Sequence, residues 1–442
     1  MAARFVLVVV AAFLASLAAY VVWHQAQFLT NASRGAIFLG VPLLGCATCL
    51  AALRLPRGAR ASFALVVVSA IVAVYGFEAY LLARKIAART ENAAGPGDDT
   101  RTKYEVVRDL RAMGQNAYPA VFPAYLTQTG LDGKLHSPLT VGGREILPLG
   151  GIARGETVLC NEAGPFVTYK SDRYGFNNPD TAWDGPVRLA AVGDSFTQGV
   201  CVPPGENYAA LLGAINLGSS GAGPLIELAA IKEYLPALKP RVVLWFFFEG
   251  NDLPGDFAIE KKSPLLLSYL DGSRQDLMSR ATDADAALRR YVDALIAAGP
   301  ERVETSAGSL QSVISFIGLA QLREALRLPD ALGEADYPLF ARVLGEAKRS
   351  VAGWGGRLYI VYIPSFCPIV GGTCDPALAN IHARVTEIAR DQGLPVIDLL
   401  PALTHSDDPR GLFTRRSGGH FGPKGNRVVA DTVRARLAQD GD

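Results

Sequence analysis

Ser195 follows an apolar run, Val187-Arg-Leu-Ala-Ala-Val192, and lies in Val192-Gly-Asp-Ser-Phe-Thr197. The run predicts a strand, and Gly193 with Asp194 predicts a tight turn that a side chain at 193 would obstruct. Such a turn presents the Ser195 hydroxyl at the start of a helix, whose first amide groups favour an anion beside it. The pattern therefore predicts a serine nucleophile.

Two later segments carry the other groups that a nucleophilic serine needs. Phe248-Glu-Gly-Asn-Asp252 ends another apolar run and offers the amide of Asn251, and Gly419-His-Phe-Gly-Pro-Lys-Gly-Asn426 offers a base, His420. Open parallel sheets bind ligands outside the carboxyl ends of their strands. We therefore expect Ser195, Asn251 and His420 to converge there.

Strands and helices alternate from residue 187 onward. The predicted strands are 187–192, 214–217, 241–248, 357–362 and 395–398, and the predicted helices are 207–213, 225–237, 376–392 and 423–439. Strands that alternate with helices predict a parallel sheet covered by helices. We expect an α/β, flavodoxin-like three-layer domain with about five strands over residues 186–442.

Two other stretches of the soluble part lack this alternation. Residues 255–345 form an insertion with a helical stretch at 283–295, which either covers the strand ends as a lid or packs on the flank of the domain. Residues 91–185 begin with a small, polar linker and continue as short strands and loops, so we expect an accessory region.

The first 90 residues contain three apolar stretches, at 5–23, 36–53 and 62–83, of which only the last holds a charge, Glu78. Each is long enough to span hydrocarbon. A cleaved signal peptide is the alternative for the first stretch, but its apolar core exceeds the roughly 7 to 15 residues of such peptides. We expect a membrane region with three transmembrane helices at 1–90.

Basic residues on the two sides of the third stretch give opposing topology signals. They are Arg54, Arg57 and Arg60 before it and Arg84, Lys85 and Arg89 after it. The odd number of spans and the cysteines favour an extracytoplasmic catalytic domain. In the soluble part, Cys367 with Cys374 and Cys160 with Cys201 are candidate disulfides, with free buried thiols as the alternative.

Charge and composition exclude other classes of partner. A net charge of +1 without a basic run excludes the electrostatic footprint of a nucleic-acid-binding protein. The four cysteines of the soluble part form no Cys-x-x-Cys pair and the histidines do not cluster, so we expect no metal site and no cofactor.

Residues 187–440 resemble the SGNH, or GDSL-type, hydrolases. Gly193-Asp-Ser195 is similar to their nucleophile block, Asn216-Leu-Gly-Ser-Ser-Gly221 to their glycine block, Gly250-Asn-Asp252 to their asparagine block, and His420 to the base of the last block. Residues 171–179 also resemble a segment that precedes this domain in some membrane-anchored members.

The resemblance implies an esterase mechanism in which Ser195 attacks an ester carbonyl while His420 takes and returns the proton. It implies an oxyanion hole made by the Ser195 amide, the Gly221 amide and the Asn251 side chain. Asp194 and Asp252 are supporting residues in these blocks.

One departure from the family lies three residues before His420, where Ser417 replaces the usual aspartate and Gly418 follows. Such an acid orients the imidazole and stabilises the imidazolium. Either Ser195 and His420 act as a dyad, or another group supports the ring. The candidates are a main-chain carbonyl near Ser417, which we favour, and the carboxylates of Asp407 and Asp408.

Each motif also has a purely structural interpretation as a turn, a strand-to-helix corner or a cap. Their common order at successive strand ends favours catalysis, although Glu249 receives no role. The sequence thus predicts a membrane-anchored serine esterase that removes acyl groups, such as acetyl, from an extracytoplasmic glycan or lipid-linked sugar. The alternatives are an O-acyltransferase that modifies an envelope or exported polysaccharide, and a non-catalytic envelope-assembly protein that has lost its acid.

Overall fold

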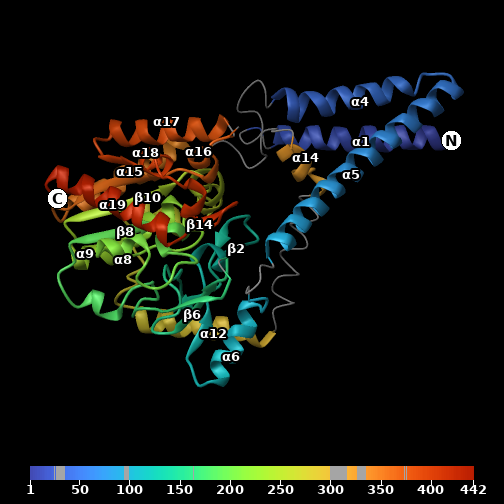
Figure 1. The fold of residues 1–442 in the computed structure, drawn as a ribbon. Helices are drawn as coiled ribbons and strands as arrows, with labels where there is room; N and C mark the ends of the chain where they lie inside the picture. Colours follow the sequence, from blue (N-terminus) through green and yellow to red (C-terminus); the bar gives the residue numbers. More distant parts are fainter. Residues whose placement is uncertain are drawn as a thin grey trace. The chain divides into compact units, whose positions relative to one another are not determined.

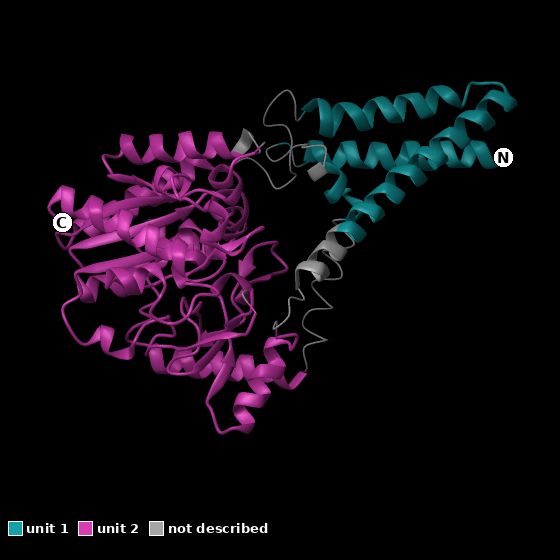
Figure 2. Cartoon of the chain, viewed as in Figure 1, with its two compact units in different colours: residues 1–92, 304–334 teal, residues 93–303, 335–442 magenta. Residues whose placement is uncertain are grey.

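The computed structural model describes residues 1–23, 25, 35–93, 99–162, 164–298, 316–325, 335–372, 374 and 376–442. The chain divides into two compact units (Figures 1 and 2). Unit 1 comprises residues 1–92 and 304–334, and unit 2 comprises residues 93–303 and 335–442. The insertion predicted at 255–345 is therefore divided between the two units.

Unit 1 consists of helices. They are α1 (Ala2–Trp23), a turn (Ala36–Gly40) that continues into α4 (Val41–Ala52), α5 (Arg57–Ala93) and the short α14 (Ala320–Ala325). Leu7, Ala11, Cys49, Ala52 and Ala64 pack together where α1, α4 and α5 meet. Small side chains at such contacts allow helix backbones to approach closely.

Two helices in the described residues, and not the predicted three, are long and apolar enough to cross a membrane. They are Ala2–Trp23 with 22 residues and Arg57–Arg84 with 28. The apolar helix Ala36–Ala52 is shorter. At 1.5 Å per residue it reaches about 26 Å, less than the roughly 30 Å of a hydrocarbon core. The prediction of a third span is wrong because an apolar helix of this length falls short of the hydrocarbon thickness.

Glu78 of α5 has its carboxylate fully engaged by the returning segment of the insertion. Its side chain is buried, and its two oxygens accept the backbone N–H groups of Gln321 and Leu322 at 2.9 and 2.7 Å. Tyr75, one turn earlier, donates its hydroxyl to the carbonyl of Ile317 at 3.0 Å. A carboxylate in an apolar helix needs such donors, since an unpaired charge there is costly.

Unit 2 is built on a parallel five-stranded sheet in the order β12-β11-β10-β8-β9 (Figure 1), as the alternation predicted. The strands are β8 (Leu189–Gly193), β9 (Ile215–Asn216), β10 (Val242–Phe248), β11 (Arg357–Ile363) and β12 (Val396–Asp398). Each lies within two residues of its predicted bounds.

Alternate side chains of β10 enter opposite cores, which explains the three layers. Val243, Trp245 and Phe247 pack with α9 (Pro224–Leu238), α15 (Tyr337–Ala352) and α17 (Pro376–Asp391). Val242, Leu244 and Phe246 pack with α8 (Tyr208–Leu212), α18 (Leu400–Thr404) and α19 (Pro423–Asp440). A strand buried on both faces is apolar throughout, as the run from 242 to 248 is.

The accessory region of unit 2 contains a second, smaller sheet in the order β1-β6-β7. The elements of the accessory region are α6 (Lys103–Ala112), β1 (Ala117–Pro119), turns at Pro123–Leu126 and Asp180–Trp183, β2 (Gln128–Thr129), β3 (Leu135–His136), β4 (Thr140–Val141), β5 (Arg144–Glu145), β6 (Glu156–Cys160) and β7 (Val167–Lys170). A disulfide joins Cys160 at the end of β6 to Cys201. It fastens the accessory sheet to the segment that follows Ser195.

The remaining elements of unit 2 are short apart from one helix. They are α7 (Ser195–Gln198), a turn (Asp252–Phe257), α10 (Ala258–Glu260), α11 (Pro264–Ser268), a turn (Tyr269–Asp271), α12 (Ala281–Ala298), α16 (Phe366–Val370), a turn (Pro409–Leu412), β13 (Phe413–Arg415) and β14 (Gly418–Phe421). The last two strands form an antiparallel hairpin that carries His420. A second disulfide joins Cys367 to Cys374, so both candidate pairings are present.

Candidate active site

Ser195 begins helix α7 directly after β8. Asp194 caps this helix, since its side chain accepts the backbone N–H of Phe196 at 2.9 Å. A Cβ on Gly193 would lie 2.2 Å from Thr197 Oγ1 and 2.8 Å from the carbonyl oxygen of Phe246, so only glycine fits. The tight turn thus arises from close approach of the backbone to its neighbours.

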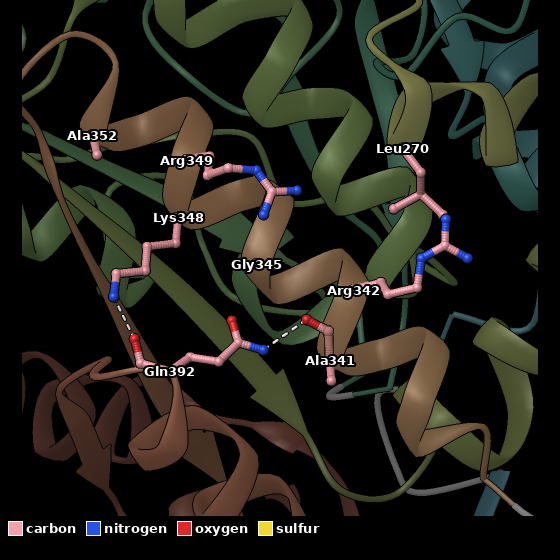
Figure 3. Close-up of a pocket in the computed structure, with 8 residues that line it drawn as sticks. All are labelled: Leu270, Ala341, Arg342, Gly345, Lys348, Arg349, Ala352 and Gln392. Atoms are coloured by element: carbon pink, nitrogen blue, oxygen red, sulfur yellow. Dashed lines mark hydrogen bonds between the residues drawn. The ribbon is translucent and has the colours of Figure 1, made fainter.

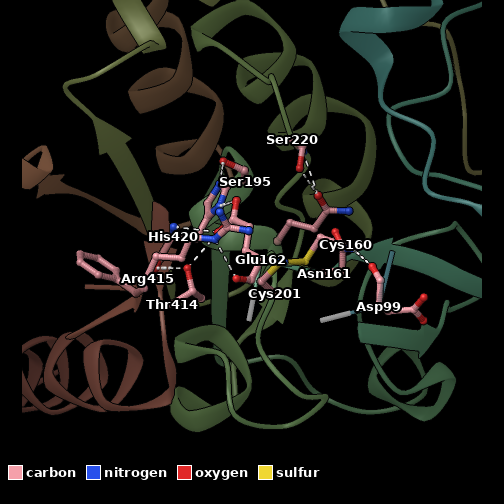
Figure 4. Close-up of a disulfide and its surroundings, with 12 residues drawn as sticks. Asp99, Cys160, Asn161, Glu162, Ser195, Cys201, Ser220, Thr414, Arg415 and His420 are labelled. Atoms are coloured by element: carbon pink, nitrogen blue, oxygen red, sulfur yellow. Dashed lines mark hydrogen bonds and ion pairs between the residues drawn. A yellow bond between two sulfur atoms is a disulfide. The ribbon is translucent and has the colours of Figure 1, made fainter. Parts of the chain in front are cut away.

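Ser195, His420 and Glu162 form a continuous hydrogen-bonded chain (Figure 4). His420 Nε2 lies 2.9 Å from Ser195 Oγ, and His420 Nδ1 lies 2.8 Å from Glu162 Oε1. When Nδ1–H donates to the carboxylate, Nε2 is left to accept the serine proton. The predicted pair of Ser195 and His420 therefore meets, and a carboxylate stands behind it.

Glu162 comes from the accessory region and is hydrogen-bonded to both strands of the hairpin that carries His420. Its Oε2 accepts the backbone N–H of His420 at 3.2 Å and the hydroxyl of Thr414 at 2.9 Å, and its carbonyl accepts from Arg415 Nε at 2.9 Å. A Cβ on Gly419 would lie 3.0 Å from Glu162 Oε2. Glycine at this position allows the carboxylate to approach.

The expected dyad is therefore corrected to a three-residue chain, and the candidates for the support of His420 were wrong. The ring Nδ1 is bound by a carboxylate and not by a main-chain carbonyl near Ser417. Asp408 is instead paired with Arg416 at 2.7 Å, and Asp407 is exposed.

Glu162 is a carboxylate held in its charged form by its surroundings. Burial raises its pKa, but the hydrogen bond and the charge of His420 oppose burial more strongly and bring the pKa to about 2. A charged carboxylate stabilises the imidazolium that forms when His420 takes a proton.

One feature of the sequence points to Glu162, through the cysteines. Cys160 pairs with Cys201, six residues after Ser195, and Glu162 follows Cys160 by two residues. The backbone N–H of Glu162 lies 3.0 Å from Cys201 Sγ. The predicted disulfide therefore placed an acidic residue within a few residues of the nucleophile turn.

The two other predicted oxyanion donors lie at the ends of the strands that flank β8. Gly221 follows β9 with φ of +70°, a conformation that glycine adopts without strain. The loop that holds it is tied to β8, because Ser219 N–H donates to the carbonyl of Gly193 at 3.1 Å. Asn251 follows β10, donates its Nδ2 to Asp256 at 2.8 Å and also hydrogen-bonds to the carboxylate of Asp194.

The two predicted supporting acids, Asp194 and Asp252, are fully buried. Burial raises the pKa of Asp194 to about 6, against hydrogen bonds from Phe196, Ser195 and Asn251. Asp252 accepts the backbone N–H of Phe248 at 2.7 Å, and burial with the charge of Glu227 raises its pKa well above the usual range. Asp252 therefore closes the turn after β10.

A larger surface hollow lies along α15 and contains none of the predicted site residues (Figure 3). It measures about 590 Å³. Two of its basic side chains are engaged: Arg349 pairs with Glu346 at 2.7 Å, and Lys348 donates to the carbonyl of Gln392. Gln392 in turn donates to the carbonyl of Ala341 at 2.6 Å. Through the two contacts of Gln392, α15 is hydrogen-bonded to the segment that follows α17.

Comparison of the sequence with family models and with curated proteins gives no match. Solved structures do resemble part of the chain. A lipase/acylhydrolase from Enterococcus faecalis is 12% identical, with 57% of this chain and 96% of that chain covered and a TM-score of 0.33. A member of the lipolytic protein G-D-S-L family from Veillonella parvula is 13% identical, with 57% and 98% covered and a TM-score of 0.32. An acetyl xylan esterase is 13% identical, with 57% and 100% covered and a TM-score of 0.32.

Proposed function

We propose that the protein is a serine esterase. The observation that carries the proposal is the hydrogen-bonded chain from Ser195 Oγ to His420, 2.9 Å, and from His420 to Glu162, 2.8 Å. A hydroxyl, an imidazole and a carboxylate in this order can activate an oxygen nucleophile at neutral pH.

The reaction proceeds in two halves. Ser195 Oγ attacks the ester carbonyl as its proton passes to His420 Nε2, and the resulting oxyanion accepts hydrogen bonds from the Ser195 amide, the Gly221 amide and Asn251 Nδ2. His420 then gives the proton to the departing alcohol, which leaves an acyl-enzyme. Water attacks this ester, again with His420 as base, and releases the carboxylic acid and free Ser195. Glu162 stays ionised and balances the imidazolium in both halves.

We further propose that the protein is anchored in a membrane and that its unit 2 lies outside the cytoplasm. The helices Ala2–Trp23 and Arg57–Arg84 support anchoring by their length and hydropathy. The pairings Cys160–Cys201 and Cys367–Cys374 support an oxidising compartment, since disulfides persist there and not in a reducing cytosol. An anchored enzyme in that compartment meets envelope glycans and lipid-linked sugars, and we propose acyl esters of these as substrates.

The experiment that tests the activity uses the full chain in detergent micelles. A fluorophosphonate probe should label the wild type and should not label Ser195→Ala, whereas Ser279→Ala, an exposed serine, should label normally. Release of nitrophenol from p-nitrophenyl acetate should follow the same pattern. Equal labelling of wild type and Ser195→Ala, or none in either, would overturn the proposal.

The same preparation separates hydrolysis from acyl transfer. Acid release without an added acceptor supports the esterase. Product that forms only when a glycan is added would identify an O-acyltransferase in which a sugar hydroxyl replaces water. The non-catalytic alternative rested on a missing acid, and Glu162 at 2.8 Å from His420 removes that motive.

A further inference from the structure

A small cavity lies beside the predicted oxyanion donors. It measures about 100 Å³, and its walls come from four parts of unit 2: the accessory region, the loop after β9, the start of α9, and the insertion. Ala124 and Leu266 are wall residues from the first and last of these, and Ile226 comes from α9. The α/β core alone would leave this cavity without two of its walls.

Two wall residues connect the cavity to the site. Gly221 is the predicted oxyanion donor after β9, and Asp256 accepts the side-chain amide of Asn251 at 2.8 Å. The oxygen of a bound acyl group would lie at the predicted donors Gly221 and Asn251, with its carbonyl carbon one bond away. The acyl carbons beyond the carbonyl would then extend towards Gly221 and Asp256, which line the cavity.

The surface that the cavity offers to a ligand is apolar. Its two carboxyl groups are already engaged: Asp256 binds Asn251, and Glu260 accepts the backbone N–H groups of Gly223 and Leu225 at 2.6 and 2.9 Å. Burial also raises the pKa of Asp256 to about 7 and that of Glu260 to about 8, so negative charge on these walls is reduced near neutral pH. An apolar cavity stays dry and favours hydrocarbon over sugar or water.

The volume limits the length of the hydrocarbon. A dry protein cavity of about 150 Å³ holds benzene, which has six carbons, so about 100 Å³ holds roughly four carbons. An acetyl group would leave most of this cavity empty, and a fatty acyl chain would exceed it.

We propose, resting on the esterase function above, that this cavity binds the tail of the substrate's acyl group and selects short chains of three to four carbons beyond the carbonyl. Butanoyl and pentanoyl esters are then the preferred class, in place of the acetyl esters expected from sequence. Each methylene that enters an apolar pocket improves kcat/KM by about fourfold, so pentanoyl should exceed acetyl by roughly 60-fold.

The test is a series of p-nitrophenyl esters from acetyl to dodecanoyl, hydrolysed by the full chain in detergent. We expect kcat/KM to rise to butanoyl or pentanoyl and to fall from octanoyl onward. A profile that falls steadily from acetyl, or that peaks at octanoyl or beyond, would overturn the proposal even if no variant were made.

Two variants change the cavity in opposite directions. Ala124→Leu fills it from a half-buried position and should lower the ratio of pentanoyl to acetyl kcat/KM at least tenfold. Leu266→Ala enlarges it and should move the optimum to a longer chain. Ala182→Leu is the matched control. It makes the same alanine-to-leucine change at a half-buried position that does not line the cavity, and it should keep the wild-type profile.

The outcomes also distinguish this proposal from the esterase function. If no ester is hydrolysed and Ser195 is not labelled by a fluorophosphonate, the esterase function itself fails. If Ser195 is labelled and esters are hydrolysed, but Ala124→Leu and Leu266→Ala both fold and keep the wild-type profile, only the assignment of the cavity fails.

Discussion

Glu162 binds His420 at two points, through the ring at Nδ1 and through the backbone N–H. The ring contact fixes the tautomer of His420, and the backbone contact fixes the position of the hairpin that carries the ring. Because one carboxylate makes both contacts, its removal affects the protonation and the position of the base together.

Glu162→Gln is expected to lower kcat severely. The amide keeps the shape of the carboxylate but cannot neutralise an imidazolium, and loss of a triad acid costs about 10⁴-fold in turnover. The measurement is kcat on p-nitrophenyl butanoate, with folding checked by the melting temperature. Asp408→Asn, at one of the positions that sequence suggested, should stay within about threefold of wild type; the reverse ranking would reject Glu162 as the acid.

The acid stability of the protein should depend on the same carboxylate. The pKa of Glu162 is lowered to about 2 in the folded chain from an ordinary value of 4.5. A lowered folded pKa gives stabilisation that is present above about pH 4.5 and is lost as the pH falls towards 2. The difference in melting temperature between wild type and Glu162→Gln should therefore shrink steadily from pH 5 to pH 2.5. A difference that stays constant over this range would contradict the lowered pKa.

Breaking the Cys160–Cys201 disulfide is expected to reduce activity more than breaking Cys367–Cys374. The first pairing ends two residues before Glu162 and six residues after Ser195, whereas the second closes a separate loop. Cys160→Ser with Cys201→Ser should lower kcat at least tenfold as Glu162 loses its fixed position. Cys367→Ser with Cys374→Ser is the matched control, and equal activity in the two double variants would show that the first disulfide does not position the acid.

Asn251→Ala should lower kcat by about 100- to 1000-fold with little change in KM, as expected for loss of one oxyanion donor. Its amide donates to Asp256, so the variant also leaves that carboxylate without this partner. Asn116→Ala, which changes an exposed asparagine directly before β1 of the accessory sheet, is the control for the substitution itself. A rise in KM at constant kcat would assign Asn251 to substrate binding and not to the transition state.

Sequence patterns predicted those parts of the fold that depend on local periodicity. The apolar run at 241–248 predicted β10, and the alternation of strands and helices predicted α9 between β9 and β10. The turn at Gly193 and the glycine beside His420 marked the two ends of the Ser195–His420 contact. The span at 36–53 failed because the stretch is too short: its helix runs from Ala36 to Ala52, about 26 Å against the roughly 30 Å of a hydrocarbon core.

Glu162 was out of reach for a different reason. It lies in a loop without periodicity, 258 residues from His420, and nothing in its neighbours distinguishes it from a solvated glutamate. Only the pairing of Cys160 with Cys201 linked that loop to the nucleophile, and it did so through tertiary structure. The contact of Asn251 with Asp256 is local by contrast, since the two residues lie five apart in one turn.

The origin of the acid in the accessory region has a consequence for how such chains are classified and divided. A fragment that starts at residue 186 would contain all four blocks that resemble those of SGNH hydrolases and would still lack the carboxylate that binds His420. We therefore expect a protein trimmed to the motif-bearing part, or a fusion of that part to another leader, to lose most of its activity. Conversely, a serine in place of the terminal aspartate is no sign of a degenerate enzyme when a partner for the imidazole can be recruited from upstream.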